Sequence, residues 1–145
     1  MTDTVLLEVH DGVATVSLNQ PESGNALGMT MGRDLLRVAL KVEGDPAVRA
    51  VVVTGAGKHF CFGGDLNGMS GQGEALGGYL IELTTNIHAA ISCFTRMRAP
   101  VIAAVNGTAA GGGVGALGQA RGCIMRPRRP MPARLRPDRF PGPIV

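Results

Sequence analysis

The fold of this 145-residue chain can be predicted from residues 100–115, which read PVIAAVNGTAAGGGVG. Residues 101–105 form an apolar run with β-branched side chains, which is typical of a buried strand. A polar break at Asn106-Gly107 follows, and three glycines come after it, where a helix can begin. Glycines let the backbone approach a ligand closely, and a helix start offers unpaired N–H groups. This stretch can therefore stabilise negative charge with main-chain atoms alone.

A second stretch upstream has the same form. Residues 51–55 read VVVTG, and residues 60–66 read FCFGGDL, so an apolar strand again precedes a glycine turn. Two such turns side by side can each direct one N–H group at a single oxygen atom, which is the arrangement called an oxyanion hole. The alternative is that the glycines at 63–64 and 111–113 only make tight turns.

Three motifs in this order resemble the crotonase (enoyl-CoA hydratase/isomerase) superfamily: Asn25-Ala26-Leu27, the FCFGGDL segment, and residues 100–115. The resemblance spans most of residues 1–120. It implies an α/β fold of the crotonase type, a spiral of ββα units, here in truncated form. It also implies an acyl-CoA thioester as substrate, a role in fatty acid metabolism and an enolate-like intermediate. Coenzyme A enters as part of the substrate, and no metal or other cofactor is expected.

By position, the resemblance assigns the two oxyanion-hole N–H groups to Gly64 and Gly112. Asp65 is expected to cap the short turn after it, and the Phe62 ring stands where the family often has a small residue and is expected to narrow the pocket. Further residues are expected to contact the substrate: Ala26, Phe62, Gly63, Asp65, Leu66 and Gly111.

The acid and base of a hydratase are missing from the pattern. In hydratases of this family a catalytic glutamate closely follows the glycine turn, but that position is Gly115 here. The second carboxylate would fall in the tail, where Asp138 is the only acid. His59 is nearest the expected site, and we interpret it as a solvated loop residue. The resemblance therefore predicts an acyl-CoA-binding chain with weak or no activity, and enzyme status stays open.

The remaining elements follow from periodicity. Residues 5–10 and 13–18 alternate apolar and polar around Asp11-Gly12, which predicts a hairpin. Helices are expected over residues 30–42 and 79–97. The glycine-rich segment between Gly68 and Gly78 shows no apolar pattern and is predicted to be a mobile loop.

Charge and composition divide the chain into an acyl-CoA-binding core at 1–118 and a tail at 119–145. Residues 1–120 carry 7 Lys and Arg against 10 Asp and Glu, whereas residues 121–145 carry 7 Arg and one acid. Six prolines in the tail oppose a helix or a central strand, so it is predicted to be disordered. A shifted reading frame in GC-rich DNA would also produce this Arg- and Pro-rich composition, and would make the chain an incomplete crotonase.

Two other functions are a dinucleotide-binding protein and a non-catalytic fragment. Residues 113–118 match G-x-G-x-x-G, with Asp138 at the distance of a ribose-binding acid, but the glycines do not follow their strand directly. A non-catalytic fragment with a basic tail would bind nucleic acid only nonspecifically.

No membrane contact is expected, and three widely spaced cysteines favour the reducing cytoplasm. The resemblance implies a homotrimer or hexamer, as in full-length members of the family.

Overall fold

A computed structural model of the chain describes residues 3–113 and the backbone of residues 122–125. Its strands form a five-stranded sheet in the order β1-β2-β3-β4-β5. The first pair of strands is antiparallel, as the predicted hairpin requires, and the following pairs are parallel. The strands are β1 (Val5–His10), β2 (Val13–Leu18), β3 (Ala50–Gly55), β4 (Val101–Val105) and β5 (Gly122–Met125).

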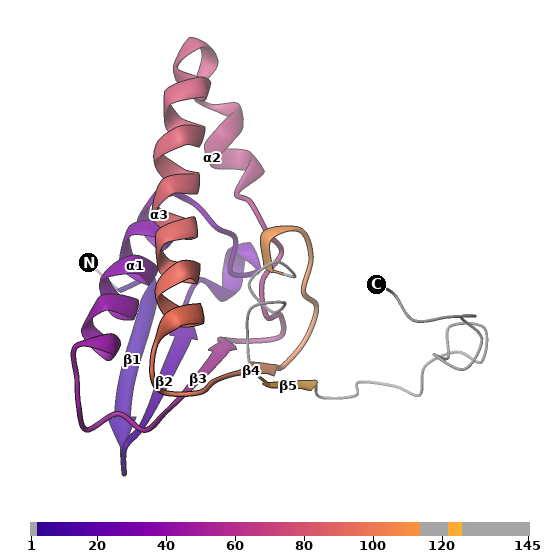
Figure 1. Ribbon diagram of the computed structural model, residues 1–145. Coiled ribbons are helices and arrows are strands. Elements are labelled where there is room, and N and C mark those ends of the chain that lie inside the picture. Colours follow the sequence, from indigo (N-terminus) through magenta and orange to yellow (C-terminus); the bar gives the residue numbers. More distant parts are fainter. Residues whose placement is uncertain (1–2, 114–121, 126–145) are drawn as a thin grey trace, which may run out of the picture.

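Two long helices, α1 (Met29–Glu43) and α3 (Leu76–Arg96), pack against each other over one face of the sheet (Figure 1). The two helices approach closely at Gly32, where an added Cβ would lie 3.3 Å from a methyl carbon of Leu83. The short helix α2 (Leu66–Ser70) lies beside the first half of α3, and both extend beyond the edge of the sheet (Figure 1). The 3-10 turns η1 (Pro21–Ser23) and η2 (Gly73–Ala75) precede α1 and α3.

The hydrophobic core lies between the two helices and this face of the sheet. Alternate residues of β2 and β4 point into it, as period-two strands require. The helix α1 contributes one apolar stripe with a spacing of three to four residues. The core includes Ala14, Val16, Leu18, Met31, Leu35, Val38, Val42, Val51, Phe60, Val101, Ala103 and Val105.

The prediction of a mobile loop between Gly68 and Gly78 is wrong for most of this segment. The end of α2, the turn η2 and the first residues of α3 lie there instead. The carboxylate of Asp65 starts α2 by accepting hydrogen bonds from the Asn67 and Gly68 N–H groups, both at 3.1 Å. This cap is the one that the sequence predicted for Asp65.

The strand β5 falls inside the segment 119–145, for which the sequence predicted disorder. Its four residues precede Pro127, the first of the six prolines, so their N–H groups are free to pair with β4. The rest of that segment, at 119–121 and 126–145, lies outside the described residues, as do Gly115 and Asp138. The division of the chain at residue 118 stays a prediction.

Asp34 on α1 ties the N-terminal segment to the core. Its Oδ2 accepts hydrogen bonds from the Thr4 hydroxyl at 2.7 Å and the Thr4 N–H at 3.2 Å, and its Oδ1 accepts one from Arg37 at 3.1 Å. Burial acts to raise the pKa of Asp34, but the hydrogen bonds from Thr4 and the charge of Arg37 outweigh it, so the pKa is lowered.

We expect Asp34→Asn to lower the free energy of unfolding by about 1 kcal/mol at neutral pH, because charge-assisted hydrogen bonds become neutral ones. The lowered pKa means that the stabilisation by Asp34 is complete above the unfolded value of about 3.9 and is lost as pH falls through the folded value. Urea unfolding at several pH values measures both effects.

Asp3→Asn is the control, because the only described partner of the Asp3 side chain is Arg37, in an exposed ion pair at 3.5 Å. It should change the free energy of unfolding by less than about 0.5 kcal/mol. Equal effects of the two substitutions would show that Asp34 does not anchor Thr4.

Candidate functional site

The loops after β3 and β4 leave the same edge of the sheet and run beside each other. The N–H groups of Phe60 and Cys61 donate to the Thr108 carbonyl, at 3.0 and 3.2 Å. The Ala110 N–H donates back to the Cys61 carbonyl at 2.9 Å. These main-chain bonds extend the parallel pairing of β3 and β4 beyond the strands, and they bring the two predicted glycine turns together.

The two turns meet with no side chain between them. Gly63 has φ +92° and Gly111 has φ +49°, a left-handed backbone that favours glycine. A Cβ atom at Gly63 would lie 3.0 Å from the Ala110 carbonyl oxygen and 3.1 Å from the Gly112 nitrogen. Only glycine at position 63 allows this approach.

Gly64 and Gly112, the predicted oxyanion-hole residues, are both exposed at this contact. Among the turn, loop and cap hydrogen bonds of residues 3–113, neither the Gly64 N–H nor the Gly112 N–H is a donor. Residues 112 and 113 have helical backbone, and a helix starts with N–H groups that lack an intrahelical partner. We therefore identify no acceptor for either N–H group within the described residues.

A third segment, around Ala26 and Leu27, joins the contact. The Leu27 N–H donates to the Gly63 carbonyl at 2.7 Å, and the Leu27 carbonyl accepts from the Asp65 N–H at 3.2 Å. The Leu27 side chain reaches the other turn, because a Cβ at Gly112 would lie 3.0 Å from its Cδ1. The structure thus brings all three sequence motifs to one place.

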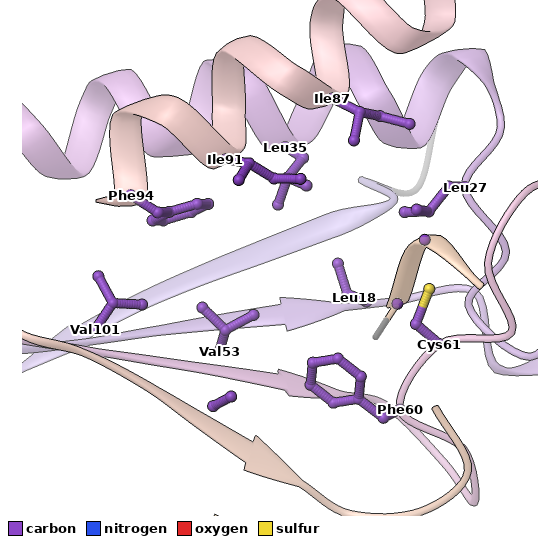
Figure 2. A pocket seen from close by; sticks show the side chains of 13 residues that line it. Leu18, Leu27, Leu35, Val53, Phe60, Cys61, Ile87, Ile91, Phe94 and Val101 are labelled. Carbon is purple, nitrogen blue, oxygen red and sulfur yellow. The ribbon is translucent and has the colours of Figure 1, made fainter. Parts of the chain in front are cut away.

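An apolar cavity of about 50 Å³ lies behind the turns, between the helices and the sheet. Figure 2 shows Ile87, Ile91 and Phe94 of α3 facing Val53 and Val101 of the sheet across it. Its lining is apolar, and a cavity of this size holds only a few non-hydrogen atoms. The other lining residues are Leu18, Leu27, Leu35, Phe60, Cys61, Ala103, Gly112 and Gly113.

Cys61 lies at the inner wall of this cavity beside Leu27 (Figure 2). Burial raises the pKa of the Cys61 thiol, against the opposing effect of the Gly63 N–H, which donates to its sulfur at 3.4 Å. A buried thiol whose pKa is raised stays neutral at pH 7 and packs as a small apolar side chain.

The structure shows where three of the predicted substrate contacts lie. The Asp65 carboxylate caps α2, as the sequence predicted, and the Leu66 side chain is 76% exposed. The Phe62 ring is not among the residues that line the cavity. It covers Gly24 and lies against the His59 ring, with centroids 4.4 Å apart.

His59 is not the solvated loop residue that the sequence predicted. It is half-buried, and its Nδ1 atom is buried without a hydrogen-bond partner among the described residues. Contact with the Phe62 ring accounts for this burial, and residue spacing does not reveal such a contact.

Sequence reasoning assigned no role to Asn25 and Asn106, although both contact this region. The Asn25 side chain is fully buried and bonds three main-chain groups. Asn106 bonds three as well. The available signal was a lone amide inside an otherwise apolar motif, because a buried amide requires partners.

Within residues 3–113, no group of three His, Cys, Asp or Glu side chains could hold a metal ion. No helix in the described part of the chain is both long enough and apolar enough to cross a membrane.

Residues 8–119 match the model of the family described as enoyl-CoA hydratase/isomerase. The chain belongs to this family. It is 43% identical over 113 residues to the Mycobacterium tuberculosis protein called "Probable enoyl-CoA hydratase EchA14", covering 77% of the chain and 43% of the relative. It is 35% identical over 117 residues to the Escherichia coli 1,2-epoxyphenylacetyl-CoA isomerase, covering 78% of the chain and 44% of that protein. The chain thus spans less than half the length of these relatives.

The crystal structure of an enoyl-CoA hydratase from Bacillus anthracis superposes with a TM-score of 0.77 at 27% identity. The match covers 84% of this chain and 47% of the other. The predicted crotonase-type α/β fold is therefore confirmed, over about half of that fold. Enzymes of this family use CoA thioesters and need no metal or other cofactor, as the resemblance implied.

We expect Gly63→Ala to lower the free energy of unfolding by about 1–3 kcal/mol, because alanine is strained at φ +92° and its methyl group would press on the Ala110 carbonyl. Thermal or urea unfolding measures the loss. Gly78→Ala is the matched control: it lies in α3 with no atom near its Cβ position, and should stabilise the chain by up to about 1 kcal/mol. A wild-type melting curve for Gly63→Ala would mean that the two turns are not in contact in solution.

Proposed function

We propose that this chain binds an acyl-CoA thioester, and that the N–H groups of Gly64 and Gly112 stabilise negative charge on the thioester oxygen. Loss of an α-proton, or addition of a nucleophile at the β-carbon, places that charge on the oxygen. Two preorganised donors lower the energy of such a state, and one donor is typically worth about 10²–10³ in rate.

The observation that carries the proposal is the contact between the two glycine turns. Gly63 lies against residues 110–112, which sets the exposed amides of Gly64 and Gly112 on neighbouring turns. Main-chain donors held by strand pairing need no rearrangement when charge develops, and this is the property that an oxyanion hole requires.

The cavity behind the turns supports an acyl ligand. Gly112 and Gly113 are among the residues that line it, and its lining is mostly apolar. An apolar acyl tail gains free energy by leaving water for such a lining. We therefore propose that the thioester oxygen faces the amides while the acyl carbons point toward this cavity.

Hydration is not part of the proposal, because it needs a positioned acid or base within hydrogen-bond reach of the substrate. Gly115 occupies the position of the family glutamate. Of the nearby titratable groups, the Asp65 carboxylate caps α2 and the His59 ring packs on Phe62. We propose an acyl-CoA-binding chain that is inactive or weakly active as a hydratase. Trimeric or hexameric assembly, a cytoplasmic location and a place in fatty acid metabolism rest on the family alone.

The rival functions have less support. In a dinucleotide-binding fold the glycine motif directly follows a strand, but β4 ends at Val105 and the motif starts at Gly113. A non-catalytic fragment that binds through its basic tail involves residues 126–145, outside the described part of the chain.

The test compares acetyl-CoA with S-ethyl-CoA, a thioether that differs by lacking the carbonyl oxygen. Two amide hydrogen bonds should make the thioester bind at least about tenfold more tightly, as measured by isothermal titration. Equal affinity for the two ligands, or no binding of either, would overturn the proposal.

Substitution at Gly112 identifies the donor. Gly112→Pro removes the N–H, and proline is tolerated at the first residue of a helix. It should reduce the preference for the thioester to about threefold or less, the effect of one remaining bond. Gly112→Ala, which keeps the N–H and adds a methyl group near Leu27, is the control and should retain more of the preference. Equal losses in both variants would assign the effect to steric contact.

A further inference from the structure

We propose that Asn25 and Asn106 are positioning residues, which hold the first glycine turn in register with the second through the carbonyl oxygen of His59. This inference rests on the proposed oxyanion hole, because it concerns where the Gly64 N–H lies relative to the Gly112 N–H. Neither asparagine is expected to touch the ligand.

The two amides come from loops far apart in sequence and meet at one atom. The Asn25 Nδ2 donates to the His59 carbonyl oxygen at 2.8 Å, and the Asn106 Nδ2 donates to it at 3.5 Å. A carbonyl oxygen has two lone pairs, so it can accept both donors. The His59 carbonyl is thus the point where the loop before α1 and the loop after β4 are joined.

Each amide also holds the turn that leads to His59. The Asn25 Nδ2 donates to the Ala56 carbonyl at 3.0 Å, and the Asn106 Nδ2 donates to the Gly57 carbonyl at 3.0 Å. The Asn106 Oδ1 accepts from the Gly55 N–H at 3.2 Å. The segment from Gly55 to His59 is therefore held by side-chain amides at both ends.

The backbone of Asn25 suits this task. Its φ of +56° is left-handed, a region in which asparagine is enriched among non-glycine residues. Its Oδ1 accepts from the Gln20 N–H at 2.9 Å, so the amide also fixes its own loop. A fully buried amide with three bonds to main-chain groups has one orientation only, and it transmits that orientation to its partners.

Downstream of His59 the described bonds are mostly between main-chain groups, with one more from the Gly63 N–H to the Cys61 sulfur at 3.4 Å. Phe60 and Cys61 donate to the Thr108 carbonyl, and Phe62 donates to the Gly24 carbonyl at 3.0 Å. Substitutions that keep the backbone N–H leave these main-chain bonds in place. The two asparagines supply side-chain bonds that a substitution can remove, at the start of the segment that ends in Gly64.

Loss of either amide should let the segment 55–64 shift relative to residues 110–112. A displacement of about 1 Å is enough to weaken a catalytic hydrogen-bond geometry severely. The part of the affinity that depends on the thioester carbonyl should fall, while contacts with the rest of coenzyme A should remain. This separates a positioning role from a general structural one.

The experiment uses Asn25→Gly, in which glycine keeps the left-handed φ without strain, and Asn106→Ala. Asn19→Ala is the matched control, because the Asn19 Nδ2 also donates to a main-chain carbonyl, that of Asp3 at 3.2 Å, away from the turns. For each protein, titration gives the affinities for acetyl-CoA and S-ethyl-CoA. The infrared carbonyl frequency of bound acetyl-CoA, labelled with ¹³C, gives the hydrogen bonding of the carbonyl directly.

We expect the thioester preference to fall to about threefold in Asn25→Gly and Asn106→Ala, the effect of the one bond that stays in place, with S-ethyl-CoA affinity kept within about twofold. The carbonyl frequency should move toward its value in a solvent that donates no hydrogen bonds. Asn19→Ala should behave as the wild type. Asn106 is only half-buried, so its variant decides the question if Asn25→Gly does not fold.

The two possible failures are distinguishable. A wild-type chain without thioester preference would overturn the proposed function itself. A wild-type preference that both asparagine variants retain, or equal losses of affinity for thioester and thioether, would overturn the positioning role and leave the oxyanion hole intact.

Discussion

The structure depends on the absence of side chains where the loops after β3 and β4 lie against each other. Gly63 touches residues 110–112, and a Cβ at Gly107 would overlap the Lys58 carbonyl oxygen. Main chain therefore packs on main chain, at distances that any larger residue would prevent. The close approach lets the Thr108 carbonyl accept from Phe60 and Cys61, and these bonds extend the register of the sheet into the site.

The helices and the sheet hold the two loops in place. The helices α1 and α3 cover one face of the sheet, and the apolar residues of β2, β3 and β4 fill the space between. Both loops leave from strands that are paired in parallel and buried, so their starting points are rigid. The buried amide of Asn25 then links a third loop to the same place. A site made of main-chain donors needs this support, because no functional side chain can adjust to correct an error of position.

Much of the fold could be predicted from the sequence, because the spacing of apolar residues along several elements matched a strand or a helix unambiguously. The hairpin around Asp11-Gly12, the helix α1 and the strand β4 follow from alternation, helical spacing and an apolar run. The turn at α2 and its Asp65 cap were predicted, but η2 and the first residues of α3 were missed because the glycines between 68 and 78 leave no apolar pattern there. The packing of Phe62 against His59 and Gly24 was not predicted, because it joins residues whose contacts leave no pattern in the sequence.

The sequence by itself determined which residues can form the glycine turns and which family the chain resembles, since both are properties of local composition and motif order. Only the tertiary structure decided that the turns touch and that their amides are free of other partners among the described residues. It also decided that Asn25 and Asn106 share the His59 carbonyl. The reason is physical: a local pattern specifies backbone conformation, whereas contacts between residues 30 to 50 positions apart arise only when the strands pair and the helices cover them.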